Sequence, residues 1–157
     1  MRKKAYLILG ICIIVLLAIL LVFVLNKDSK FYLDDIHYST SERFISIESD
    51  DLSKLMEDKK SFVIFTYLPY CTFSIPCDVI FETFLNENDM SFYSIPYDKL
   101  SEVKYFDEVK YAPSVILVNK GVIVEYLDAN SDNDLKKYQD AKEFSSWIEK
   151  YVYLKNN

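Results

Sequence analysis

Pro69–Cys77, with the sequence PYCTFSIPC, places two thiols between two different apolar patterns. The stretch follows Ser61–Tyr67 (SFVIFTY), an almost continuously apolar run that is typical of a strand covered on both faces. From Cys77 onward, apolar residues recur at helical spacing. At a strand-to-helix turn, the helix amides and dipole can stabilise a thiolate, and the sulfur remains accessible. The stretch therefore indicates a redox dithiol formed by Cys71 and Cys77.

The remaining apolar pattern predicts an α/β domain with a mixed central sheet. Asn119-Lys120-Gly121 lies between two apolar runs and is a hairpin signal. The order of elements is β-α-β-α-β followed by a hairpin and a last helix, which describes a mixed sheet with helices on both faces. Strands are predicted at 44–47, 61–67, 90–95, 113–118 and 122–127, and helices are predicted from residue 49, from 77 to 85 and from 144 to 152.

The N-terminal residues predict a membrane anchor. The run from Ala5 to Leu25 is apolar, and a helix rising ~1.5 Å per residue over this length can cross a hydrocarbon core of ~30 Å. The run ends at Asn26 without the small residues of a signal-peptidase site, so we expect the anchor to be retained. Cys12 lies inside this run, and we interpret it as a small apolar residue.

The charges that flank the anchor predict its orientation. Arg2-Lys3-Lys4 precede it, and the positive-inside rule keeps such a flank in the cytoplasm. We therefore divide the chain into a cytoplasmic flank and transmembrane anchor at 1–26, a polar stalk at 27–43 and a domain at 44–157. The domain is expected to be extracytoplasmic, in a compartment where disulfides form and persist.

The charge of the exported part argues against some partners. Without Arg2-Lys3-Lys4, the chain has 15 basic and 24 acidic residues, which gives a formal charge of −9. A strongly acidic domain is a poor match for nucleic acid. We expect no nucleic-acid partner.

Several segments resemble the thioredoxin family at matching places. Lys60–Cys71 (KSFVIFTYLPYC) looks like the strand that runs into the active-site cysteine of that family, and Pro76 before Cys77 resembles the proline of its Cys-Gly-Pro-Cys loop. Ala112-Pro113-Ser114 looks like the family's Ile-Pro-Thr, and the helix at 144–152 looks like its last helix. The resemblance implies a thioredoxin-like fold, with a cis proline at Pro113 that faces the dithiol.

The resemblance also implies thiol–disulfide exchange at the two cysteines. Cys71 at the strand end is the favoured nucleophile, and Cys77 is the resolving thiol. Five residues separate them where the family has two, so Ser74 could instead cap the helix and make Cys77 the more acidic thiol. The order of the two thiols therefore stays open. Phe65 stands where many thioredoxins carry a buried acid that relays protons.

Three neighbours of the dithiol are expected to contact a peptide substrate. Tyr70 and Phe73 belong to an aromatic rim around the cysteines, and Ala112 precedes the proline that forms the substrate-side platform. Ordinary packing of the aromatic side chains is an equally good interpretation.

Other chemistries fit the sequence less well. Arg43 is the only arginine of the exported part and no Thr-x-x-Cys precedes a thiol, so a peroxidase is disfavoured. His37 is the only histidine and lies upstream of the dithiol, which argues against copper delivery and a Ser-His-Asp site. The segment 128–139 begins like a calcium loop but has Asn133 and Gln139 where Gly and Glu are needed. We expect no cofactor and no bound metal.

We therefore expect a single-pass protein of a bacterial cell membrane that acts on thiols and disulfides of exported proteins or peptides. The alternative is a redox-silent, thioredoxin-like binding or accessory module of a membrane or export assembly, in which the two cysteines form a structural disulfide. The sequence does not identify the redox partner or the direction of electron flow.

Overall fold

The structure is a computed structural model that describes residues 30–68 and 77–154. Within these two ranges, no helix combines the length and the apolar character needed to cross a bilayer. The predicted anchor at 5–25 and Cys12 lie outside the described residues.

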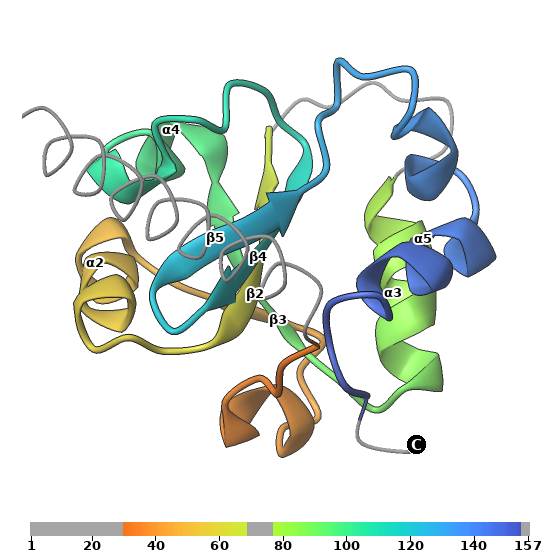
Figure 1. Cartoon of the computed structure of the whole chain (residues 1–157), viewed down its shortest axis with the longest axis horizontal. Coiled ribbons are helices and arrows are strands. Elements are labelled where there is room, and N and C mark those ends of the chain that lie inside the picture. Colours follow the sequence, from red (N-terminus) through yellow and green to blue (C-terminus); the bar gives the residue numbers. More distant parts are fainter. Residues whose placement is uncertain (1–29, 69–76, 155–157) are drawn as a thin grey trace, which may run out of the picture.

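Five strands form one mixed sheet in the order β1-β3-β2-β4-β5 (Figure 1). β2 pairs in parallel with β3 and antiparallel with β4, where Thr66 lies opposite Ser114. This arrangement confirms the predicted mixed sheet. The strands are β1 (Phe44–Ser46), β2 (Phe62–Tyr67), β3 (Phe92–Pro96), β4 (Ser114–Asn119) and β5 (Val122–Tyr126).

Helices cover both faces of the sheet, as expected (Figure 1). α2 (Ser49–Glu57) and α4 (Tyr97–Leu100) lie on one face, and α3 (Cys77–Glu87) packs with α5 (Ala141–Ile148) on the other. Three short 3₁₀ helices complete the described residues, namely η1 (Asp35–Tyr38), η2 (Lys104–Phe106) and η3 (Leu135–Tyr138).

The side chains of β2 divide the core into two clusters. Phe62 and Ile64 pack on the α2 side, whereas Val63 and Phe65 pack on the α3 side. Successive residues of a strand point to opposite faces, so a strand between two helical layers is apolar at nearly every position. The almost continuous apolar run in the sequence follows from this position, with the buried Thr66 as the exception.

Gly121 shapes the hairpin between β4 and β5. Its φ is +72° and its N–H donates to the carbonyl of Lys60 at 2.9 Å. A Cβ built at Gly121 would lie 2.4 Å from the carbonyl oxygen of Met56, so both the conformation and the space require glycine here. The hairpin signal in the sequence is confirmed by this turn.

The segment predicted as a polar stalk packs with the domain over part of its length. Phe31 forms a parallel bridge with Val152, and Phe31, Leu33 and Tyr38 are buried in the α3 cluster. The Tyr38 hydroxyl donates to the carbonyl of Tyr153 at 2.8 Å. The buried side chains of this segment are interspersed with exposed residues, among them Tyr32, so the segment shows no periodicity in sequence although it contributes to the core.

His37 belongs to the same segment and is fully buried. Its Nδ1 lies 2.7 Å from the carbonyl oxygen of Ser91, and its ring meets Tyr93 edge-on at 4.9 Å. Nε2 has no hydrogen-bond partner among the described residues. Burial lowers the pKa of His37, and the Ser91 carbonyl and the charge of Asp34 oppose this shift.

We expect His37 to make folding stability fall as the pH falls. The pKa of His37 is about 6.5 in the unfolded chain and lower in the folded protein. As the pH falls, the unfolded chain therefore binds the proton before the folded protein does. Its contribution is complete above the unfolded pKa and is lost as the pH falls below it. Urea unfolding between about pH 7.5 and about pH 5.5 measures this loss.

His37→Asn is the matched control, because an amide can keep the donor to Ser91 without titrating in this range. Its free energy of unfolding should change less with pH than that of the unchanged protein. Equal slopes for the two proteins would show that His37 is not the titrating group.

Candidate functional site

The predicted site residues fall into two groups. Cys71, Tyr70 and Phe73 lie outside the described residues. Cys77, Ala112 and Pro113 are described, and they lie at the end of the sheet where β2 finishes and β4 begins.

Cys77 is the first residue of α3 and is buried, with 6% of its surface exposed. It belongs to the same apolar cluster as Phe65 and Phe81. The N-terminus of a helix carries partial positive charge, which favours a thiolate over a thiol. The helix predicted to begin at Cys77 is confirmed, and its position suits thiol chemistry.

The peptide bond between Ala112 and Pro113 is cis, as the resemblance implied. Pro113 is buried, whereas Tyr111 is 49% exposed. Ser114 follows as the first residue of β4 and donates from Oγ to the carbonyl of Leu127 at 2.6 Å. The backbone around Pro113 is therefore fixed by a buried hydrogen bond to the end of the neighbouring strand.

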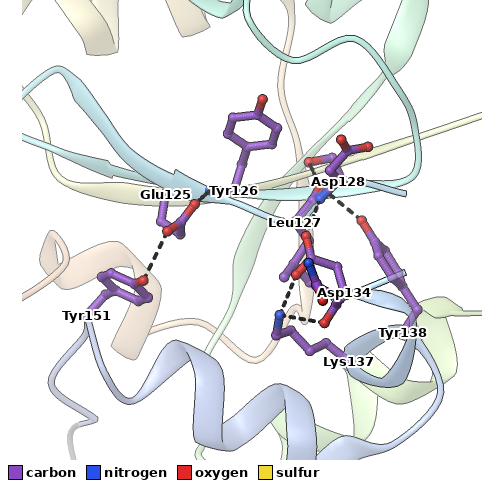
Figure 2. A network of polar contacts seen from close by, with 10 residues as sticks. Glu125, Tyr126, Leu127, Asp128, Asp134, Lys137, Tyr138 and Tyr151 are labelled. Carbon is purple, nitrogen blue, oxygen red and sulfur yellow. Dashed lines mark hydrogen bonds and ion pairs between the residues drawn. The ribbon is translucent and has the colours of Figure 1, made fainter. Parts of the chain in front are cut away.

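Tyr138 contacts both the segment of Pro113 and α3. Its single hydroxyl proton is shared between the carbonyl oxygen of Pro113, at 2.8 Å, and that of Leu127, at 3.0 Å. Figure 2 shows Tyr138 beside Leu127. Its ring meets that of Phe81, one turn after Cys77, at 5.9 Å. One buried side chain therefore joins the proline segment to the first turns of α3.

The surroundings of Tyr138 keep its hydroxyl protonated, so that it remains a hydrogen-bond donor. Burial raises its pKa most, and the charges of Asp134, Cys77 and Asp128 raise it further. The phenol therefore stays protonated at any physiological pH.

Hydrogen bonds and an ion pair within residues 128–137 stabilise the acidic segment before Tyr138 (Figure 2). The N–H of Asp128 donates to Oδ2 of Asp134 at 3.0 Å, and Asp134 also forms an ion pair with Lys137. The N–H of Asn130 donates to Oδ1 of Asp128 at 2.8 Å. These contacts fold the segment into a compact turn that presents Tyr138 to the site.

Phe65, which stands where many thioredoxins carry a buried acid, is an apolar residue of the core. Its ring lies 5.4 Å from that of Phe44, 5.9 Å from that of Tyr67 and 5.3 Å from that of Phe81. A phenyl ring cannot transfer a proton, so any proton relay at this site has to use other groups.

Tyr138 is the residue that sequence reasoning missed. It follows an acidic loop and belongs to η3, which is too short to show a periodic pattern. Its partner Pro113 lies 25 residues earlier in the chain. The remaining signal was a single tyrosine between polar residues, and it does not distinguish a buried ring from an exposed one.

No protein-family model and no curated protein matches the sequence. Solved structures match the fold. A mutant thioredoxin from Halobacterium salinarum is 20% identical with a TM-score of 0.50, and the match covers 71% of this chain and 93% of that one. A Schistosoma mansoni thioredoxin pre-protein is 20% identical with a TM-score of 0.48, covering 71% of this chain and 100% of that one.

A mutant thioredoxin from Entamoeba histolytica is 23% identical with a TM-score of 0.46, and the match covers 61% of this chain and 96% of that one. The fold rests on the match to the Halobacterium salinarum protein. Together with the strand order and the helices on both faces, that match shows that the chain has a mixed α/β, thioredoxin-like fold.

Proposed function

We propose that this protein is a membrane-anchored, extracytoplasmic thiol–disulfide oxidoreductase that acts on exported proteins through Cys71 and Cys77. The observation that carries the proposal is the position of Cys77 at the start of α3, a helix that packs through Phe81 on Tyr138, whose hydroxyl binds the backbone of Pro113. This arrangement combines a thiol at a helix N-terminus with a fixed backbone segment beside it. Both features serve thiol–disulfide exchange, since one stabilises the thiolate and the other can align an extended substrate.

The burial of Cys77 supports its role as the resolving thiol. A thiol that is 6% exposed is shielded from the disulfide of a bulky protein, but an attack from within the same chain can reach it. Cys71, which precedes it by six positions, is then the nucleophile.

The exchange proceeds in two balanced steps. The Cys71 thiolate attacks one sulfur of a substrate disulfide, so that a mixed disulfide forms and the other substrate sulfur leaves as a thiolate. The Cys77 thiolate then attacks the sulfur of Cys71 and releases the second substrate thiolate. Two electrons pass to the substrate and the protein dithiol becomes a disulfide. The same steps in reverse oxidise a substrate dithiol.

Tyr138 would serve this chemistry as a positioning residue. Its hydroxyl satisfies the carbonyl of Pro113 inside the protein, so the proline segment keeps its place when substrate binds or leaves. Its ring also packs against α3, so the same residue fixes the distance between Pro113 and the helix that carries Cys77.

The membrane topology rests on the sequence. The basic residues before the anchor at 5–25 favour a cytoplasmic N-terminus, and the acidic domain follows the anchor. The described domain then lies in the oxidising compartment where its substrates fold.

We expect Tyr138→Phe to destabilise the protein by about 1 to 3 kcal/mol, because it removes the donor to a buried carbonyl. Tyr126→Phe is the matched control, since that hydroxyl donates to the carbonyl of Glu108 at 3.2 Å on the surface. The control should change stability by less than about 0.5 kcal/mol. Urea unfolding of both variants measures the difference, and equal effects would remove the special role of Tyr138.

The roles of the two cysteines can be tested by trapping. Cys77→Ser leaves the mixed disulfide unresolved, so exported proteins should accumulate as adducts of Cys71 on non-reducing gels. Cys71→Ser should accumulate few adducts because the remaining thiol is buried. Adducts only in Cys71→Ser would reverse the two roles. Adducts in neither variant, with a permanently oxidised unchanged protein, would instead favour the redox-silent module with a structural disulfide.

The topology predicts the result of protease treatment of intact cells. A protease that cannot cross the membrane should remove the domain and leave a short membrane fragment that contains residues 5–25. Protection of the whole chain in intact cells, with cleavage only after lysis, would contradict the extracytoplasmic location.

A further inference from the structure

A pocket of about 330 Å³ lies between α3 and the sheet, beside the start of the helix. Tyr67 at the end of β2 and Asp78 at the start of α3 both line it. Asp78 directly follows Cys77 in the chain. The pocket therefore adjoins the start of the helix that carries Cys77. Its lining is formed by Phe44, Phe65, Tyr67, Asp78, Glu82 and Ser94.

One wall of the pocket is aromatic. The ring of Phe65 lies 5.4 Å from that of Phe44 and 5.9 Å from that of Tyr67, so three rings from β1 and β2 form a continuous surface. Phe65 is buried, whereas Phe44 and Tyr67 are partly exposed. Aromatic faces carry partial negative charge and attract cations held against them.

The opposite wall carries two carboxylates. Asp78 and Glu82 are four residues apart on α3, and both are exposed on its solvent side. Residues at this spacing lie on the same face of a helix. Among the described residues, neither carboxylate has a hydrogen-bond or ion-pair partner, so both remain available to a ligand.

No basic side chain of the described residues neutralises this pocket. Arg43 precedes Phe44, but its guanidinium is bound to Asn86, Asp89 and the carbonyl of Met90, at the other end of α3. The pocket thus combines an aromatic wall and two unpaired negative charges. This combination selects a positively charged group with an apolar stem, which matches a lysine or arginine side chain.

We propose that this pocket binds a lysine or arginine side chain located near the reacting cysteine of the substrate protein. The inference rests on the proposed function and adds a substrate class to it. A peptide that reaches the thiol turn can place a neighbouring side chain between the aromatic wall and the carboxylates, where Coulomb attraction and contact with the rings act together. The pocket would then determine which cysteines the protein prefers.

The test compares two disulfide peptides that differ only by a lysine or an N-acetyl-lysine near the cysteine. The full chain in lipid nanodiscs should process the lysine peptide with a kcat/KM about 3 to 30 times higher. In Asp78→Asn/Glu82→Gln this ratio should fall to about one. Because the ratio is taken within one protein, any effect of the substitutions on Cys77 itself cancels.

Glu87→Gln/Asp98→Asn is the matched control. It removes the same charge from residues outside the pocket lining, so it separates local binding from the general attraction of an acidic protein for cations. The control should keep the preference of the unchanged protein. An equal loss of preference in both double variants would overturn the proposal.

A second measurement keeps the pocket testable if neither peptide reacts, an outcome that would contradict the oxidoreductase function. Titration with the same peptides carrying serine in place of cysteine should shift the amide NMR signals of Phe65, Tyr67 and Asp78 with the lysine peptide only. Equal shifts with the acetylated peptide would overturn the site. Tighter binding of butylammonium than of the lysine peptide would overturn the assignment to a protein side chain and indicate a small-molecule amine.

Discussion

Burial of β2 on both faces is the constraint on which the rest of the structure depends. The strand lies at the centre of the sheet, between β3 and β4, and its side chains belong alternately to the two core clusters. Burying a polar side chain here costs its contacts with water, as it does for Thr66, whose Oγ1 has no hydrogen-bond partner among the described residues, so the strand tolerates few polar residues. Contacts with neighbouring segments fix the positions of both ends of β2. The carboxyl end adjoins Ser114 across the antiparallel pairing, and the amino end adjoins the N-terminal segment through the hydrogen bond from Asp34 to Ser61.

The candidate site is built at the carboxyl end of this strand by backbone carbonyls and one phenol. Leu127 accepts hydrogen bonds from Ser114 and Tyr138, and Tyr138 also reaches Pro113. Each of these polar atoms is buried, so each depends on the others for its partner. Such a network keeps the proline segment in one position relative to α3. Contacts with Tyr138 therefore hold both the proline segment and the helix that begins at Cys77.

The sequence was most informative where one element could be recognised from its own residues. The apolar run at Phe62–Tyr67, the helical spacing after Cys77 and the glycine of the hairpin each reflect a local requirement of backbone or burial. The contacts that escaped prediction join residues far apart in the chain. The Tyr38 hydroxyl reaches Tyr153, 115 residues later, and Phe31 pairs with Val152. No local pattern records such pairs, so residues 31–38 looked like a polar stalk although they complete the core.

The pairing of Phe31 with Val152 also determines at which end of the sheet the two ends of the described domain lie. Phe31 and Val152 hold the first and last described segments together near the amino end of β2. The starts of α3 and β4 lie toward its carboxyl end (Figure 1). Six residues of strand span ~20 Å. A chain fastened to a surface by its N-terminal residues would therefore carry the start of α3 roughly one strand length from the joined chain ends. The start of that helix would then be presented away from the surface.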